Sequence, residues 1–140
     1  MKKRLGLFLF FAYCGFLLWL TVFSRQTRLG DRVFKWELFW AYRAWIAGES
    51  FGKTESIQNV NNILVFIPFG VLFPIRRWRW LLITAILFSS TIEVVQFGLN
   101  LGWCEIDDVI CNVLGAAAGF GMWTWLKGKI DATGEKTWFL

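Results

Sequence analysis

The chain has 140 residues, of which 56% are hydrophobic and only 18% are charged. A typical soluble domain carries roughly 25% charged residues, so this composition favours a single-domain membrane protein. The sequence has no histidine and its three cysteines show no C-x-x-C spacing, which excludes a histidine metal site and gives no support to a disulfide framework or a zinc site.

The first apolar run covers residues 5–23 and follows a basic start. A bilayer core needs about 20 apolar residues, so this run is long enough to cross it. A signal peptide shares these features, but the run is long for one and no small-x-small cleavage site follows it. We therefore expect a retained first transmembrane helix.

A long polar connection follows, and part of it has helical periodicity. Its apolar residues recur at three- and four-residue spacing: Phe34, Leu38, Ala41, Tyr42 and Trp45. We predict an amphipathic helix over residues 31–47 that is too charged to cross the bilayer and lies in the interface. A plain connecting helix on the rim of the bundle is the alternative. Gly48 should end this helix, and residues 48–56 should form a loop.

Three more apolar runs predict transmembrane helices over residues 57–75, 80–99 and 108–126. Pro68 should kink the second helix, and Gly70 should allow close packing. Gly115 and Gly119 have the spacing that lets helices approach closely in membranes. The tail from residue 127 to residue 140 has no predicted structure. The expected fold is an all-α integral membrane protein, with four helices in one compact bundle over residues 1–140.

Basic residues predict the orientation of this bundle. The net charge of +5 could suggest nucleic acid, but Lys and Arg form short clusters beside apolar runs instead of one basic face. Dense clusters stand at the N-terminus, at residues 76–79 and in the tail, whereas residues 100–108 contain none. Orientation follows Lys and Arg near helix ends, so we predict that both termini are cytoplasmic and that nucleic acid is not a partner.

This topology brings polar side chains from three helices to the outer leaflet. The predicted pocket residues are Asn62, Ser89, Glu93, Gln96, Asp107, Asp108 and Asn112. Ionisable groups inside membrane segments are costly and mark candidate functional sites. The alternative is a structural hydrogen-bond network between helices. We expect no bound metal and no cofactor, and the oligomeric state stays open.

Three motifs in order resemble the VanZ-like family of bacterial membrane proteins. They are NILVFIPFG at 62–70, STIEVVQF at 90–97 and IDDVICNVLG at 106–115, within a matching stretch of residues 59–123. The resemblance implies a protein of the bacterial cytoplasmic membrane, and its founding member is linked to teicoplanin-type glycopeptide resistance. By motif position, the family's polar residues correspond to Asn62, Glu93, Gln96, Asp108 and Asn112.

Two functions remain open at this stage, beside a third reading in which the Gly/Ala-rich run at 115–121 makes the protein a structural subunit of a larger complex. In the first, the pocket binds an amphiphilic ligand, either a lipoglycopeptide antibiotic or an envelope lipid, and so contributes to resistance or to cell-envelope homeostasis. In the second, the protein is an intramembrane enzyme acting on an envelope lipid, with Glu93 and Asp108 dividing acid and base roles. The sequence shows no recognisable nucleophile with a base partner, which favours the first.

Overall fold

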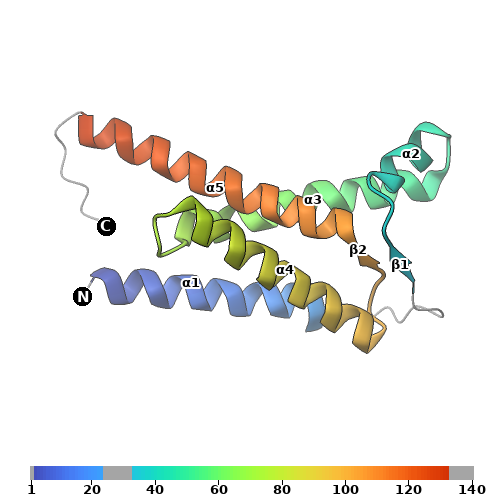
Figure 1. The fold of residues 1–140 in the computed structure, drawn as a ribbon, viewed down its shortest axis with the longest axis horizontal. Coiled ribbons are helices and arrows are strands. Elements are labelled where there is room, and N and C mark those ends of the chain that lie inside the picture. The colour runs from blue at the N-terminus through green and yellow to red at the C-terminus, as the bar shows by residue number, and fades with distance from the viewer. Residues whose placement is uncertain (1, 24–32, 133–140) are drawn as a thin grey trace.

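A computed structural model describes residues 2–23 and 33–132, which form a bundle of helices (Figure 1). The elements in chain order are α1 (Lys2–Leu18), a π-helical turn η1 (Trp19–Phe23), β1 (Phe34–Lys35), α2 (Trp40–Ile46), α3 (Ser50–Leu72), α4 (Trp78–Leu99), β2 (Cys104–Glu105) and α5 (Ile106–Ala132). The described chain is therefore almost wholly helical.

Three helical segments are long and apolar enough to cross a membrane: Arg4–Phe23, Trp78–Leu99 and Ile106–Ala132. Many large apolar side chains on them are exposed, including Phe8, Leu87, Val94 and Trp125. An apolar surface of this extent is typical of contact with lipid or with a partner. The first half of α3 contains several amides and charged residues, which lower its mean hydropathy below that of the other three.

Figure 1 shows α1 and α4 running one way and α3 and α5 running the other. The turn between α3 and α4 therefore lies at the same end as the start of α1 and the end of α5. The opposite end holds α2 and the short parallel pairing of β1 with β2. This is the up-and-down order that the four apolar runs predict.

The closest packing lies between the parallel helices α3 and α5. A Cβ atom at Gly115 would overlap the carbonyl oxygen of Ile63, and one at Gly119 would overlap that of Ile67. From the other side, a Cβ atom at Gly70 would overlap the carbonyl oxygen of Ala116. The three glycines therefore lie where the two backbones touch, as small residues do between membrane helices.

Phenylalanine rings fill the core between these helices. The Phe69 ring stacks on that of Phe88, with 5.5 Å between centroids, and the Phe10 ring lies 5.1 Å from that of Phe69. Leu17, Ile92 and other fully buried side chains extend this core along the bundle. Aromatic pairs at such distances add to the stability that burial alone provides.

Several predicted bounds differ from the structure. The helix predicted at 57–75 begins at Ser50 and ends at Leu72, so most of the loop predicted at 48–56 is helical. The helix predicted at 31–47 is wrong over its first half, where β1 pairs with β2 and Phe39 adopts a left-handed conformation that the helix cannot continue through. Residues 31 and 32 lie outside the described residues.

The last helix extends beyond its predicted end. It continues through Ala132, and the Lys129 ammonium lies 4.3 Å from the centre of the Trp125 ring. A long basic side chain can cover apolar surface in this way and keep its charge outside, which lets the helix continue into polar sequence. The rest of the predicted tail, residues 133–140, lies outside the described residues.

Candidate functional site

Buried polar side chains of the described residues lie in the half of the bundle nearer α2. They come from the first half of α3, the second half of α4, β2 and the start of α5. The members are Ser56, Asn59, Ser89, Glu93, Gln96, Glu105, Asp107, Asp108 and Asn112. Buried polar groups need hydrogen-bond partners, so the partners of each group indicate its role.

A chain of hydrogen bonds links α4 to β2 and β2 to α2. The Glu105 backbone N–H donates to Glu93 Oε2 at 3.0 Å, and the Trp40 indole N–H donates to Glu105 Oε2 at 2.8 Å. Burial, and next the charge of Asp108, raises the pKa of Glu105 to about 7, although the bond from Trp40 acts in the opposite direction. Glu93 and Glu105 therefore fix β2 and α2 against the end of α4.

Two further bonds join helices directly. Asn112 Nδ2 donates to Ser89 Oγ at 2.8 Å, which links α5 to α4. Gln96 Nε2 donates to the Thr21 carbonyl at 2.7 Å, which satisfies an acceptor in the last turn of the first apolar helix. Amide and hydroxyl bonds of this kind tie helices together within membranes.

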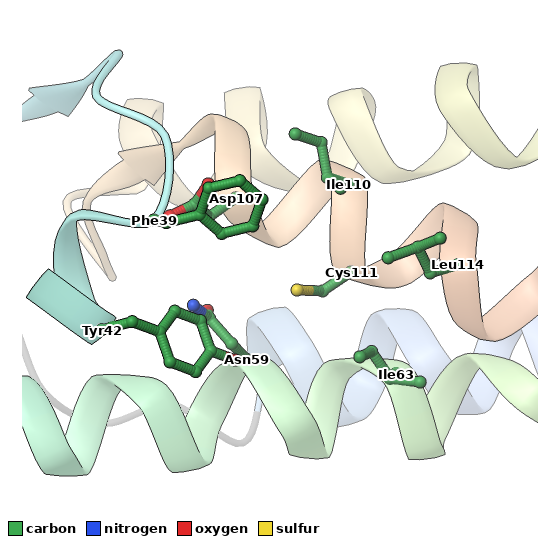
Figure 2. A pocket seen from close by; sticks show the side chains of 8 residues that line it. All are labelled: Phe39, Tyr42, Asn59, Ile63, Asp107, Ile110, Cys111 and Leu114. Carbon is green, nitrogen blue, oxygen red and sulfur yellow. The ribbon is translucent and has the colours of Figure 1, made fainter.

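A cavity of about 280 Å³ lies between α5, α3 and the start of α2, away from the hydrogen bond that joins α5 to α4 (Figure 2). Its lining residues are Phe39, Tyr42, Asn59, Ile63, Asp107, Ile110, Cys111 and Leu114. Figure 2 shows Asn59 reaching from α3 toward α5 and Cys111 reaching from α5 toward α3. Leu114 is 53% exposed, so the cavity is open along the outer face of the helix pair.

Asp107 is the acidic group of this cavity. Its side chain is 2% exposed, and neither carboxylate oxygen has a hydrogen-bond partner within the described residues. Burial raises the pKa of the Tyr42 hydroxyl at the cavity wall, and electrostatic repulsion from Cys111 and Asp107 raises it further. Asp107 thus presents buried acceptors without donors, which is costly unless a ligand donates to them.

The matched family is that of VanZ/LLP1, whose model covers residues 10–127. The chain belongs to the VanZ/LLP1 family. Protein VanZ of Enterococcus faecium is 26% identical to it over 132 residues, which cover 88% of this chain and 76% of that protein. No solved structure matches the chain. The whole buried polar cluster falls within the stretch that the family model matches.

The structure divides the seven pocket residues predicted in this VanZ/LLP1 chain into groups. Only Asp107 lines the cavity. Ser89, Glu93, Gln96 and Asn112 hydrogen-bond between elements, as described above. Asp108 is buried and acts electrostatically on Glu105, and Asn62 is half-buried on α3 outside the cavity lining.

Sequence reasoning missed Asn59 and the aromatic residues Phe39 and Tyr42. A signal for Asn59 exists, because it stands eleven residues before Gly70 and four before Ile63, which are spacings that repeat on one helix face. Once Gly70 is placed against α5, Asn59 follows on the same side. The two aromatic residues come from a segment whose path the sequence does not fix.

Glu93 and Asp108, the predicted acid–base pair, do not line the cavity. Glu93 instead accepts a backbone hydrogen bond from β2. Among residues 2–23 and 33–132, no three acidic, cysteine or histidine side chains converge as metal ligands would. The chemistry that this site offers is therefore hydrogen-bond acceptance by Asp107 beside apolar and aromatic walls.

Proposed function

We propose that this VanZ/LLP1 protein binds the head group of an amphiphilic cell-envelope molecule in the cavity between α2, α3 and α5, and that binding supports the envelope or teicoplanin-type glycopeptide resistance. The buried carboxylate of Asp107, which has no hydrogen-bond partner in residues 2–23 and 33–132, is the observation that carries the proposal. A structural role would have given these oxygens donors, as the structure does for Glu93.

The cavity has the composition that an amphiphile needs. Ile63, Ile110 and Leu114 supply apolar walls, and Asp107 lies among them. Binding sites for small molecules are mostly apolar with few polar groups that fix orientation. Because Leu114 lies on an exposed, lipid-type surface, an acyl chain outside the bundle can reach the cavity.

The membrane topology is part of the proposal. In it, α3 is a fourth crossing, whose amide-rich half is covered by α5, and α2 lies in the interface. Arg76, Arg77 and Arg79 stand at the end opposite the cavity, so positive-inside orientation puts the cavity toward the outer leaflet of the bacterial cytoplasmic membrane.

Thiol labelling of intact cells tests this topology. Lys53→Cys and Arg77→Cys place exposed thiols at opposite ends, in a background with the native cysteines replaced by serine. A membrane-impermeant maleimide should label position 53 and leave position 77 unlabelled until the cells are lysed. Labelling of intact cells only at position 77 would show that the orientation is the opposite one and that the cavity faces the inner leaflet.

Drug susceptibility tests the function. In a strain without the gene, we expect the wild-type protein to lower teicoplanin susceptibility, and Asp107→Asn and Leu114→Trp to lose that effect at equal expression. Asp131→Asn is the matched control, because Asp131 is exposed near the far end of the same helix. Retention of full activity by both cavity variants would rule out the cavity as the functional site.

A further inference from the structure

We infer that the cavity selects an amphiphile with a primary ammonium head group, which Asp107 binds as the counter-ion. This inference rests on the proposed function and narrows its ligand class. It starts from three properties of the cavity: its size, its electrostatic surroundings and the aromatic rings at its wall.

The size excludes a large ligand. Sites for drug-sized molecules span roughly 300–1,000 Å³. The cavity measures about 280 Å³, which is room for a small head group and the first carbons of a chain, but not for a whole glycopeptide. A bulky antibiotic could therefore place only one substituent here.

Several acidic side chains lie near the cavity, and Lys35 stands opposite Glu105 in the β1–β2 ladder. Glu55, Asp107 and Asp108 each raise the pKa of Glu105, which shows that these carboxyl groups share one region. Asp107 forms no ion pair with a Lys or Arg of the described chain. A buried carboxylate without an ion pair attracts a cation and repels an anionic head group.

Aromatic rings complete the wall. The Phe39 and Tyr42 rings lie 6.4 Å apart at a tilt of 57°, and both line the cavity. The faces of such rings attract ammonium groups. Phe39 keeps a left-handed backbone, with φ of 56°, to hold its ring there. Strain of this kind in a non-glycine residue is common at binding sites.

A primary ammonium satisfies these features together. Its N–H groups can donate to the two oxygens of Asp107 that have no donor in the structure, and its charge balances that of the carboxylate. A hydroxyl head group would supply a donor without a charge. A quaternary ammonium would supply a charge without a donor. Three probes with the same alkyl chain and different head groups therefore separate the contribution of the charge from that of the hydrogen-bond donor.

The experiment uses the full-length protein in phosphatidylcholine nanodiscs, with Cys14 and Cys104 replaced by serine. Cys111, which lines the cavity, is then the single thiol. Dodecylamine, dodecanol and dodecyltrimethylammonium are titrated, and the rate of N-ethylmaleimide labelling is followed by mass spectrometry. Native mass spectrometry of the same samples counts bound amphiphile directly, so the result does not depend on thiol reactivity.

We expect dodecylamine to bind and to protect Cys111 at concentrations about tenfold lower than either other probe, because a buried charge-assisted bond needs both charge and donor. Asp107→Asn should weaken the binding of dodecylamine by roughly tenfold or more and leave the binding of dodecanol nearly unchanged. Asp131→Asn should change neither. The wild-type comparison among the three probes stands by itself if Asp107→Asn does not fold.

Two further titrations identify the source of the ammonium. Ethylamine tests a free amine, and phosphatidylethanolamine added to the nanodiscs tests a lipid head group. Equal binding of all three dodecyl probes would overturn the ammonium inference and leave amphiphile binding intact. Absence of binding by every probe would overturn both the inference and the proposed function.

Discussion

Replacing Gly119 with alanine should destabilise the protein, although alanine is the better helix former. The added Cβ atom would overlap the Ile67 carbonyl oxygen and would also lie 2.8 Å from the Ile67 carbonyl carbon and 3.1 Å from its Cα atom. All three atoms are backbone, so no rotamer change relieves the overlap. The helices α3 and α5 must separate, and neighbouring contacts along the seam weaken with them.

The magnitude follows from two opposing effects. Overpacking a tight interface costs about 1–3 kcal/mol, and a rigid backbone contact belongs at the upper limit. The propensity gain from glycine to alanine offsets about 1 kcal/mol. The net loss is therefore about 2 kcal/mol. At Gly128 no atom lies within 4 Å of the added Cβ, so alanine there should gain up to about 1 kcal/mol.

Thermal unfolding in one detergent, followed by circular dichroism, measures the difference. Gly119→Ala should unfold below wild type, and Gly128→Ala should unfold at or above it. Gly115→Ala repeats the first test against the Ile63 carbonyl oxygen. If Gly119→Ala and Gly128→Ala unfold at the same temperature, the backbones of α3 and α5 do not touch as described.

Three further predictions concern the half of the bundle that holds the buried polar side chains. The pKa of Glu105 is about 7 in the folded protein and about 4.5 in the unfolded chain, so the free energy of unfolding of the wild type should fall as the pH rises from about 4.5 to about 7, by at most roughly 3 kcal/mol. Glu105→Gln should flatten this part of a plot of stability against pH, and an unchanged slope would contradict the assignment. Phe39→Gly should be more stable to denaturant than Phe39→Ala by about 1 kcal/mol, because only glycine adopts a φ of 56° without strain, and the reverse order would refute the left-handed conformation. Ser89→Ala should cost about 1–2 kcal/mol in unfolding experiments by removing the acceptor of Asn112, and adding Asn112→Leu should recover part of that loss if the bond exists.

The apolar runs and the small-residue spacing could be read from the sequence because both are local signals. Bilayer thickness sets the length of a crossing helix, and a glycine every four residues keeps one helix face flat. Gly70, Gly115 and Gly119 were therefore expected to allow close packing, and the structure shows that they pack α3 against α5. The start of α3 at Ser50 was missed because its first turns are polar and lack the apolar periodicity that identifies a helix.

The cavity could not be predicted, because it depends on contacts far apart in the chain. The pairing of Phe34 with Cys104 directs the chain toward α2 and brings Phe39 over the start of α5. A ladder two residues long leaves no alternation in the sequence. The prediction of one pocket also combined two environments, since Glu93 on α4 accepts a hydrogen bond from β2, whereas Asp107 on α5 lines the cavity.

The parallel contact of α3 with α5 has a consequence for biogenesis. All of α4 and the first turns of α5 must leave the ribosome after α3 before the backbone that covers Gly70 exists. Until then, α5 does not cover the asparagines of α3, and α3 is the one of the four long helices that is not apolar enough to rank as a candidate membrane span. In the proposed topology, α5 thus completes the insertion of α3, and truncation before Gly115 should be more damaging than its position near the C-terminus suggests.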